Sequence, residues 1–141
     1  MILPVAAPAT FVHHSRLRMG STDAAGIWYF TSALEVAHEA WEAWLESRGV
    51  PLQQVIAAGA FIMPIVHAEA DYQSPARLGD ELRVSLQLAE LTERSMVISS
   101  QISSPTGIQL ASTRVVHACV RGGAAVPWPA AFRAALTSPA G

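Results

Sequence analysis

A single carboxylate, Asp23, lies in a short polar loop directly ahead of a helical sequence pattern. The loop reads Ser-Thr-Asp-Ala-Ala-Gly over residues 21–26, and the helical pattern begins near Ser32. The first turn of an α-helix leaves backbone N–H groups without acceptors and carries about half a positive charge. The sequence therefore places an acid near the positive end of the expected helix, where a carboxylate can have a catalytic role or a structural one. Taken alone, an Asp in a loop of this composition is more often a turn or cap residue.

The helical pattern covers residues 32–48 and predicts the central helix of the domain. Ser32 and Glu35 fit a capping box, in which each side chain bonds a free backbone N–H of the first turn. Gly49 and Pro51 end the pattern. Apolar residues recur along one face and acidic residues along another: Leu34, Ala37, Trp41, Trp44 and Leu45 against Glu35, Glu39, Glu42 and Glu46. A helix of this length is roughly 25 Å long and crosses most of a small sheet.

The remaining chain reads mostly as strands. A length of 141 residues and a hydrophobic content of 51% indicate one domain, residues 1–141, with a well-filled core or surface hidden in an oligomer. Alternation predicts strands over residues 11–19, 65–72, 81–91, 95–103 and 108–121, and allows short helical turns within 50–60 and 129–136. This order predicts an α+β domain, with an antiparallel sheet of about five strands wrapped around one long helix.

The same alternation assigns side chains to the faces of the expected strands. In the second strand it places Ile65 and His67 on one face, and in the third it places Leu88 and Glu90 on one face. Each of these strands is therefore expected to have two distinct faces.

Composition and spacing argue against several function classes. The net charge of −2 gives no general attraction to nucleic acid or to an anionic membrane. Cys119 is the single cysteine and lies in an apolar run, which is typical of a buried thiol. The sequence shows no His or Cys cluster at metal-ligand spacing and no Gly-x-Ser-x-Gly elbow, so we expect neither a metal site nor a serine hydrolase. No stretch reaches 18 apolar residues, and residues 1–10 lack the features of a signal peptide, so we expect a cytoplasmic protein.

Several short motifs resemble those of a known enzyme family. They are Thr22-Asp23-Ala24-Ala25-Gly26-Ile27, Tyr29-Phe30, His38-Glu39-Ala40, Pro64-Ile65-Val66-His67-Ala68, Ser74-Pro75 and Gly79-Asp80. Together they resemble the hotdog-fold acyl-CoA thioesterases of the 4-hydroxybenzoyl-CoA thioesterase type, from about residue 11 to residue 120 and into the tail at 126–129. Within that family they are most similar to the 1,4-dihydroxy-2-naphthoyl-CoA thioesterases of phylloquinone and menaquinone synthesis. The resemblance implies a hotdog fold and hydrolysis of an acyl-CoA thioester, in which CoA is part of the substrate and no cofactor is needed.

The resemblance also implies roles for individual residues of the loop. Asp23 stands at the position of the family's catalytic carboxylate, which acts as nucleophile or as general base. Phe30 stands where the family uses a backbone N–H to polarise the thioester carbonyl, and Gly26 shapes the preceding turn. Many relatives carry a second acid two residues before the catalytic one. Here that position is Ser21, which leaves Asp23 in place and can alter the hydrogen bonding of the loop.

Other side chains have a functional and a structural interpretation. Tyr29, Phe61 and His67 are expected to border an aromatic pocket, although His67 is equally well explained as a strand histidine whose hydrogen bonds are satisfied. Arg77 and Arg114 can bind the phosphates of CoA through charge-assisted hydrogen bonds, and surface solubility explains them nearly as well.

We expect a homo-oligomer, a dimer or a tetramer. One helix and five short strands leave sheet edges and apolar surface uncovered, and the resemblance adds active sites shared between subunits. The leading substrate is an aromatic acyl-CoA, 1,4-dihydroxy-2-naphthoyl-CoA. The alternatives are a thioesterase for short- or medium-chain acyl-CoA or acyl-carrier protein, and a hotdog module that binds acyl groups without hydrolysis. Asp23 argues against the last of these, because a binding module needs no carboxylate at the thioester.

Overall fold

The structure is a computed structural model that describes residues 3–4 and 10–139. Its elements are β1 (Leu3–Pro4), β2 (Phe11–Arg16), the 3-10 turn η1 (Met19–Ser21), α1 (Ser32–Ser47), α2 (Leu52–Ala58), β3 (Ile65–Tyr72), β4 (Glu81–Leu91), β5 (Ser95–Ser103), β6 (Gln109–Ala118), β7 (Val120–Arg121), β8 (Ala124–Ala125) and α3 (Ala130–Thr137). The helical turns allowed within residues 50–60 and 129–136 are confirmed as α2 and α3.

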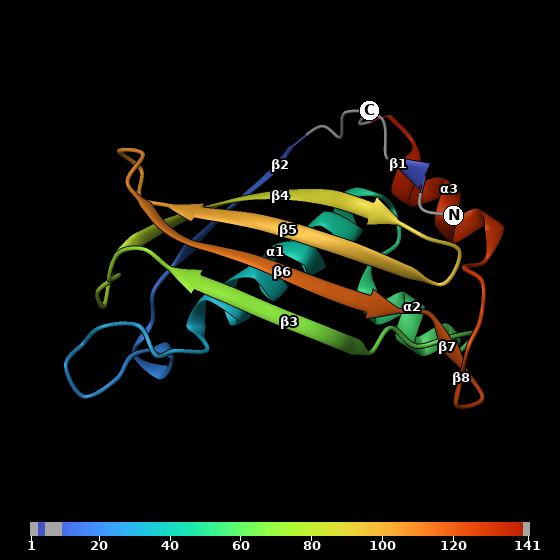
Figure 1. Cartoon of the computed structure of the whole chain (residues 1–141), viewed down its shortest axis with the longest axis horizontal. Helices are drawn as coiled ribbons and strands as arrows, with labels where there is room; N and C mark the ends of the chain where they lie inside the picture. The colour runs from blue at the N-terminus through green and yellow to red at the C-terminus, as the bar shows by residue number, and fades with distance from the viewer. Residues whose placement is uncertain (1–2, 5–9, 140–141) are drawn as a thin grey trace.

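An antiparallel sheet forms one layer of the fold and α1 forms the other. The sheet order is β1-β4-β5-β6-β3, and β2 pairs with β4 along the same edge as β1. Helix α1 contacts every strand from β2 to β6 and crosses one face of the sheet (Figure 1). The predicted α+β arrangement of a sheet around one long helix is therefore confirmed, with the two-residue β1 as an additional strand in the described part of the chain.

The core lies between α1 and the facing side of the sheet. Its largest contributors are Val36, Trp41, Trp44 and Leu45 on α1, Leu82, Val84, Leu86 and Leu88 on β4, and Met96, Ile98 and Ile102 on β5. Burying a side chain of this size stabilises the fold by roughly 1.5–3 kcal/mol. This packing fixes α1 across the sheet, so that its N-terminal end lies beside the loop that carries Asp23.

Two β-bulges overturn the face assignments made from alternation. A bulge between Leu88 and Glu90 shifts the register of β4 against β5, so Glu90 pairs with Val97 and turns to the face opposite α1. A second bulge shifts β3 between Ile65 and His67. The expectation that each of these two pairs shares a face is wrong, because a bulge inserts one unpaired residue and reverses the alternation beyond it.

The predicted capping box at the start of α1 does not form. Thr31 precedes the helix in a right-handed helical conformation and makes no side-chain cap bond. Instead, the hydroxyl of Ser32 donates to the carbonyl of Ser21 at 2.6 Å, and the Glu35 carboxylate accepts from the hydroxyls of Ser21 at 3.0 Å and Thr31 at 3.3 Å. The prediction failed because these side chains bind the polar loop rather than the free N–H groups of their own helix.

Two predicted strand ends also differ from the structure. The strand expected over residues 11–19 ends at Arg16, and residues 19–21 form the turn η1. The strand expected over residues 108–121 divides into β6 and β7, because the N–H of Cys119 between them bonds the carbonyl of Arg94 at 2.8 Å. In the described part of the chain, no helix is both long enough and apolar enough to cross a membrane.

Candidate active site

The loop that carries Asp23 is a small closed hairpin. Thr22 and Trp28 form an antiparallel bridge at its base, and the N–H of Asp23 donates to the carbonyl of Ile27 at 2.8 Å. At its tip, the N–H of Gly26 donates to the carbonyl of Asp23 at 3.1 Å. The φ angle of Gly26 is +74°, in the left-handed region that glycine adopts without steric cost. The turn ascribed to Gly26 from the sequence therefore depends on its backbone freedom.

The Asp23 carboxylate is held by one oxygen and free at the other. Its Oδ1 accepts the backbone N–H groups of Ala25 at 2.8 Å and Ile27 at 3.2 Å. Among the described residues nothing hydrogen-bonds Oδ2, and the side chain is exposed to solvent. Two charge-assisted bonds fix the orientation of the carboxylate. The second oxygen is left available to attack an electrophile or to accept a proton.

A second segment, residues 76–78, braces this hairpin from outside. The N–H of Trp28 donates to the carbonyl of Ala76, and the N–H of Leu78 donates to the carbonyl of Gly26, both at 2.9 Å. Arg77 pairs with Ile27 in an isolated antiparallel bridge between these two bonds. Of the two arginines expected to bind CoA phosphates, Arg77 is therefore the one beside the Asp23 loop.

The turn that leads into α1 presents free backbone N–H groups next to the loop. The N–H of Ser32 donates to the carbonyl of Tyr29 at 2.9 Å, and the N–H of Ala33 donates to the Tyr72 hydroxyl at 3.1 Å. Within residues 3–4 and 10–139, the N–H groups of Phe30 and Thr31 have no acceptor. Such N–H groups at a positive helix end can bind a carbonyl oxygen that becomes negative during a reaction.

These groups meet at an open cavity of about 550 Å³. Four aromatic side chains contribute to it, and the cavity is lined by Asp23, Ile27, Trp28, Tyr29, Phe30, Tyr72, Gln73, Ser74 and Pro75. Tyr29 and Phe30 are 49% and 68% exposed, and their rings meet edge to face with centroids 4.5 Å apart. Such exposed rings can pack against a flat aromatic ligand.

A larger hollow of about 940 Å³ lies between β2, β4 and the first turns of α1. Its lining is mostly polar and charged, and it contains Glu35 and Glu39 but not Asp23. We assign the chemistry to the smaller cavity, because only that one joins a free carboxylate oxygen to the turn with free N–H groups. No group of three or more His, Cys, Asp or Glu residues that could hold a metal ion occurs in the described part of the chain.

Comparison with known proteins places the chain in a family. A family model described as the thioesterase-like superfamily matches residues 17–136. The chain belongs to this superfamily. A 1,4-dihydroxy-2-naphthoyl-CoA hydrolase from Synechocystis is 36% identical over 112 residues, which cover 79% of this chain and 81% of the relative.

Solved structures of thioesterases match the fold as well. A crystal structure of a 1,4-dihydroxy-2-naphthoyl-CoA thioesterase from Synechocystis superposes with a TM-score of 0.84 at 32% identity, covering 91% of this chain and 96% of that one. A gentisyl-coenzyme A thioesterase superposes with a TM-score of 0.81 at 26% identity, covering 89% and 99%. The hotdog fold and the family resemblance predicted from the motifs are thereby confirmed.

In this thioesterase-like chain, three of the residues expected at the site lie away from the Asp23 cavity. Phe61 is buried and packs against the rings of Phe132 and Trp128, with centroids 5.0 and 6.0 Å apart. His67 and Arg114 belong to the sheet, and neither lines the cavity. The roles proposed for these three in substrate binding stay predictions, and within one subunit none of them is a wall of this cavity.

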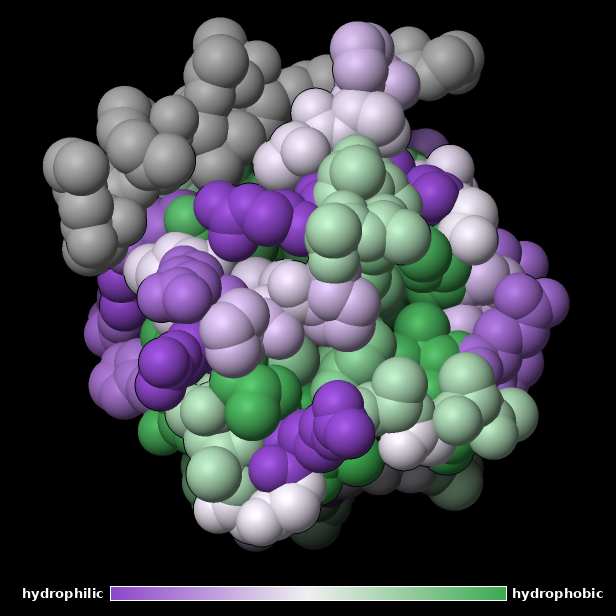
Figure 2. All heavy atoms as spheres, turned by 90° about the vertical axis from the view of Figure 1, so that its right-hand side faces the viewer, coloured by the Kyte–Doolittle hydropathy of each residue, from purple (hydrophilic) through white to green (hydrophobic). Residues whose placement is uncertain are grey.

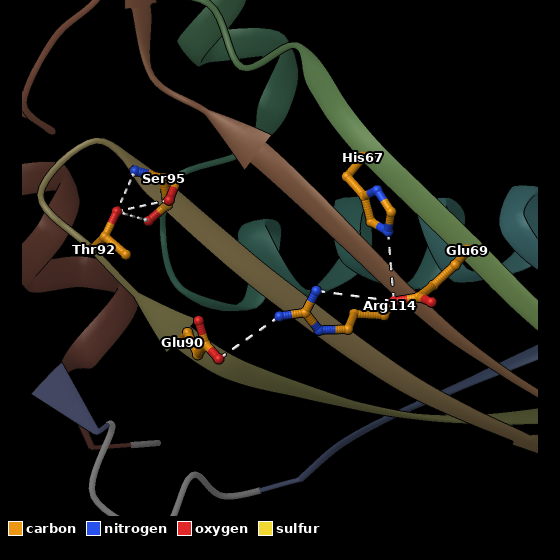
Figure 3. A network of polar contacts seen from close by, with 6 residues as sticks. All are labelled: His67, Glu69, Glu90, Thr92, Ser95 and Arg114. Atoms are coloured by element: carbon orange, nitrogen blue, oxygen red, sulfur yellow. Dashed lines mark hydrogen bonds and ion pairs between the residues drawn. The ribbon is translucent and has the colours of Figure 1, made fainter. Parts of the chain in front are cut away.

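Arg114 is part of a charged network on the sheet face opposite α1 (Figure 3). Its guanidinium lies 3.9 Å from the Glu69 carboxylate and 3.7 Å from the Glu90 carboxylate. His67 Nε2 lies 3.5 Å from the same oxygen of Glu69. Arg114 therefore already faces two carboxylates, one of which reaches it only because of the β4 bulge.

Trp28 and Tyr72 line the cavity but were not predicted from the sequence. Tyr72 comes from the end of β3 and contacts the start of α1, 39 residues away in the chain. Its ring meets the Trp28 ring edge to face with centroids 5.0 Å apart. Burial raises the pKa of Tyr72, and nearby Glu35 adds to this, although the bond from Ala33 N–H opposes it. The phenol therefore stays protonated at neutral pH.

Proposed function

We propose that this protein hydrolyses an aromatic acyl-CoA thioester to the free acid and CoA, with 1,4-dihydroxy-2-naphthoyl-CoA as the leading substrate. The observation that carries the proposal is the free Oδ2 of Asp23 at an aromatic-lined cavity, beside the unpaired N–H of Phe30. A carboxylate and an oxyanion donor at one cavity are the two groups that thioester hydrolysis needs.

The chemistry follows from these two groups. The thioester oxygen accepts the N–H of Phe30, which stabilises the negative charge that develops as the carbonyl carbon becomes tetrahedral. In the nucleophilic route, Asp23 Oδ2 bonds to that carbon, the C–S bond breaks with CoA leaving as thiolate, and water hydrolyses the resulting anhydride. In the general-base route, water attacks the carbon and gives its proton to Asp23 as the thiolate leaves.

Where water attacks the Asp23 carbonyl of the anhydride, the nucleophilic route gives a different origin for one oxygen atom of the product than the general-base route. In H₂¹⁸O, with enzyme in excess over substrate, water attacking the thioester carbonyl places ¹⁸O in the first molecule of free acid. In the nucleophilic route, if water attacks the Asp23 carbonyl of the anhydride, the first acid carries an unlabelled oxygen from Asp23. Mass spectrometry of that first product, and of the Asp23 peptide, then identifies the nucleophilic route by label in Asp23.

The choice of an aromatic acyl group rests on the cavity lining and on the relatives. Tyr29 and Phe30 present exposed rings beside the reacting groups, and aromatic pairing contributes roughly 0.5–1.5 kcal/mol beyond area burial. The relatives reported above are named for 1,4-dihydroxy-2-naphthoyl-CoA and gentisyl-CoA, both of which carry hydroxylated rings. A hydroxylated aromatic ester is therefore the class that fits best.

A substrate panel tests this proposal directly. Free thiol is measured during turnover of dihydroxynaphthoyl-, 4-hydroxybenzoyl-, benzoyl- and hexanoyl-CoA, and kcat/KM is compared. We expect the hydroxylated aromatic esters to be preferred. A preference for hexanoyl-CoA would support the alternative of a short- or medium-chain thioesterase, and the absence of thiol release from all four, and from the matching acyl-carrier-protein esters, would support an acyl-binding module.

We also propose that the protein is a homo-oligomer, at least a dimer, whose active sites lie between subunits. Strand β3 hydrogen-bonds only to β6 in the described part of the chain, so its other edge is free. Val66 on this strand is 61% exposed, and Ile56 on α2 and Ile62 are 65% and 60% exposed. Figure 2 shows hydrophobic residues among polar ones at the end of the molecule that carries α2. A long edge with apolar neighbours favours pairing with a second copy.

Light scattering at micromolar concentration measures the state of assembly. We expect the mass of a dimer or a tetramer for the wild type and a smaller mass for Val66→Asp, because a charge opposes edge pairing. A stable wild-type monomer would contradict both the oligomer and the shared site.

We propose further that the reaction needs no cofactor and that the protein is cytoplasmic. Hydrolysis at Asp23 uses only water, so dialysis against a chelator should leave the rate of thiol release unchanged. The cytoplasmic location expected from the sequence stays a prediction, which cell fractionation with an antibody can test.

A further inference from the structure

The hydroxyl of Tyr72 is the junction between β3 and the turn that precedes α1. It donates a hydrogen bond to the carbonyl of Phe30, with the carbonyl of Tyr29 as a second acceptor at 3.5 Å, and accepts the N–H of Ala33 at 3.1 Å. Tyr72 is the last residue of β3, and its ring packs edge to face on Trp28 at the base of the Asp23 loop. One phenol therefore connects the sheet to the Asp23 loop and to the start of α1, which lie on either side of the free N–H groups of Phe30 and Thr31.

Peptide planarity determines where the two free N–H groups of this turn point. In a trans peptide the N–H lies in the plane of the preceding carbonyl and points the opposite way. The carbonyl of Tyr29 is held inside the turn by the N–H of Ser32, so the N–H of Phe30 points out of the turn. The carbonyl of Phe30 is held by the Tyr72 hydroxyl, so the N–H of Thr31 points away from Tyr72.

The same phenol removes a competing donor. The N–H of Ala33 is one of the free donors of the first helical turn, and Tyr72 occupies it. Among the described residues, the N–H groups of Phe30 and Thr31, and that of Leu34 one position further along the helix, then have no acceptor. Phe30 lines the Asp23 cavity and Leu34 does not, so a substrate oxygen in this cavity meets the donors of the turn.

We propose that Tyr72 is a positioning residue for thioester hydrolysis: its phenol holds the carbonyl of Phe30 and contacts that of Tyr29, so that the N–H groups of Thr31 and Phe30 in the same two peptides are set in advance for the thioester oxygen. This inference rests on the proposed thioesterase function. A donor that is fixed before the reaction needs no reorganisation in the transition state, and losing one oxyanion donor outright costs about 10²–10³ in rate. Losing only its support should cost less, about tenfold to a hundredfold.

The substitution Tyr72→Phe keeps the ring and removes the hydrogen bonds of the hydroxyl to Tyr29, Phe30 and Ala33. For the preferred CoA ester of the panel, we expect kcat to fall about tenfold to a hundredfold while KM changes less than about threefold. A structural defect alone would reduce the amount of active enzyme without changing how the bound carbonyl is polarised. The polarisation therefore has to be measured separately.

Infrared spectroscopy of the bound thioester supplies that measurement. The ester carries a ¹³C-labelled thioester carbonyl and is trapped on the Asp23→Asn variant. The carbonyl stretch should lie at lower frequency than in water, and the addition of Tyr72→Phe should move it back toward the value in water. Tyr29→Phe is the matched control for this frequency, because the Tyr29 hydroxyl makes no bond to the turn in the described structure.

Amide NMR on the Asp23→Asn variant tests the same idea without altering Tyr72. When the ester binds, we expect the amide protons of Phe30 and Thr31 to shift downfield and that of Ala33 to stay in place, because Tyr72 already occupies it. A shift of Ala33 instead, or an unchanged kcat and carbonyl frequency in Tyr72→Phe, would overturn the inference while hydrolysis by the wild type keeps the proposed function. If the wild type hydrolyses no ester of the panel, the proposed function fails and this inference falls with it.

Discussion

Replacing His117 by Gln should make the stability of the protein less dependent on pH. His117 is 1% exposed, its ring stacks on the Trp41 ring with centroids 4.0 Å apart, and its Nδ1 lies 3.2 Å from the carbonyl oxygen of Met63. Burial, opposed by the Met63 contact and assisted by nearby His38, lowers the pKa of His117 from 6.5 to about 4. The native state therefore holds this imidazole neutral over a range where the unfolded chain protonates it.

The size of the effect follows from linkage. Between pH 6.5 and pH 4 the unfolded state binds one more proton at His117 than the native state does, so stability falls as the pH falls through this window. From pH 8 to pH 5 this residue alone should cost about 2 kcal/mol, since each pKa unit corresponds to about 1.4 kcal/mol. Above about pH 7.5 it should cause no further change.

Urea unfolding at fixed protein concentration and several pH values measures this. Fixed concentration matters because assembly would itself change the apparent stability. Between pH 8 and pH 5, the free energy of unfolding of His117→Gln should fall by about 2 kcal/mol less than that of the wild type. The matched control is His14→Gln on β2, where the side chain is exposed, and it should follow the wild type. An equal pH dependence in wild type and His117→Gln would refute the reasoning.

Four further substitutions distinguish residues of the site from residues that stabilise the fold. Gly26→Ala should cost about 1 kcal/mol of stability and lower kcat, because φ is +74° while no atom lies within 4 Å of the added methyl group; urea unfolding and thiol release measure both. Phe61→Ala should destabilise the fold by about 3 kcal/mol, since its ring packs among buried aromatics, and an unchanged urea midpoint would contradict this. Arg77→Gln should raise KM for the CoA ester several-fold, whereas Arg114→Gln should not, because Arg114 faces two carboxylates on the other side of the sheet.

Those parts of the fold that depend on nearby residues were predicted well from the sequence. The bounds of β4 and β5 match the regular alternation of apolar residues over residues 81–91 and 95–103. The Asp23 loop was found because its residues are contiguous, so a short motif contains most of its hydrogen bonds. A local pattern is sufficient where the partners of a residue lie within a few positions of it.

Features that depend on distant partners were not predicted. The bulge that turns Glu90 outward is a matter of register between two strands, and alternation along a single strand contains no information about it. Ser32 was expected to cap its own helix, but its hydroxyl bonds the carbonyl of Ser21, which only the folded loop brings near. Tyr72 reaches Phe30 across 42 residues of sequence, so no spacing rule relates the two.

Thiol release by purified Asp23→Asn tests the central claim most directly. Asn keeps the size of the side chain and its ability to accept the loop N–H groups, so the variant should unfold at the same temperature as the wild type. With 1,4-dihydroxy-2-naphthoyl-CoA, its kcat should fall at least ~100-fold, the usual cost of losing a nucleophile or a general base. A folded Asp23→Asn variant that still turns over within a few-fold of the wild-type rate would contradict the account.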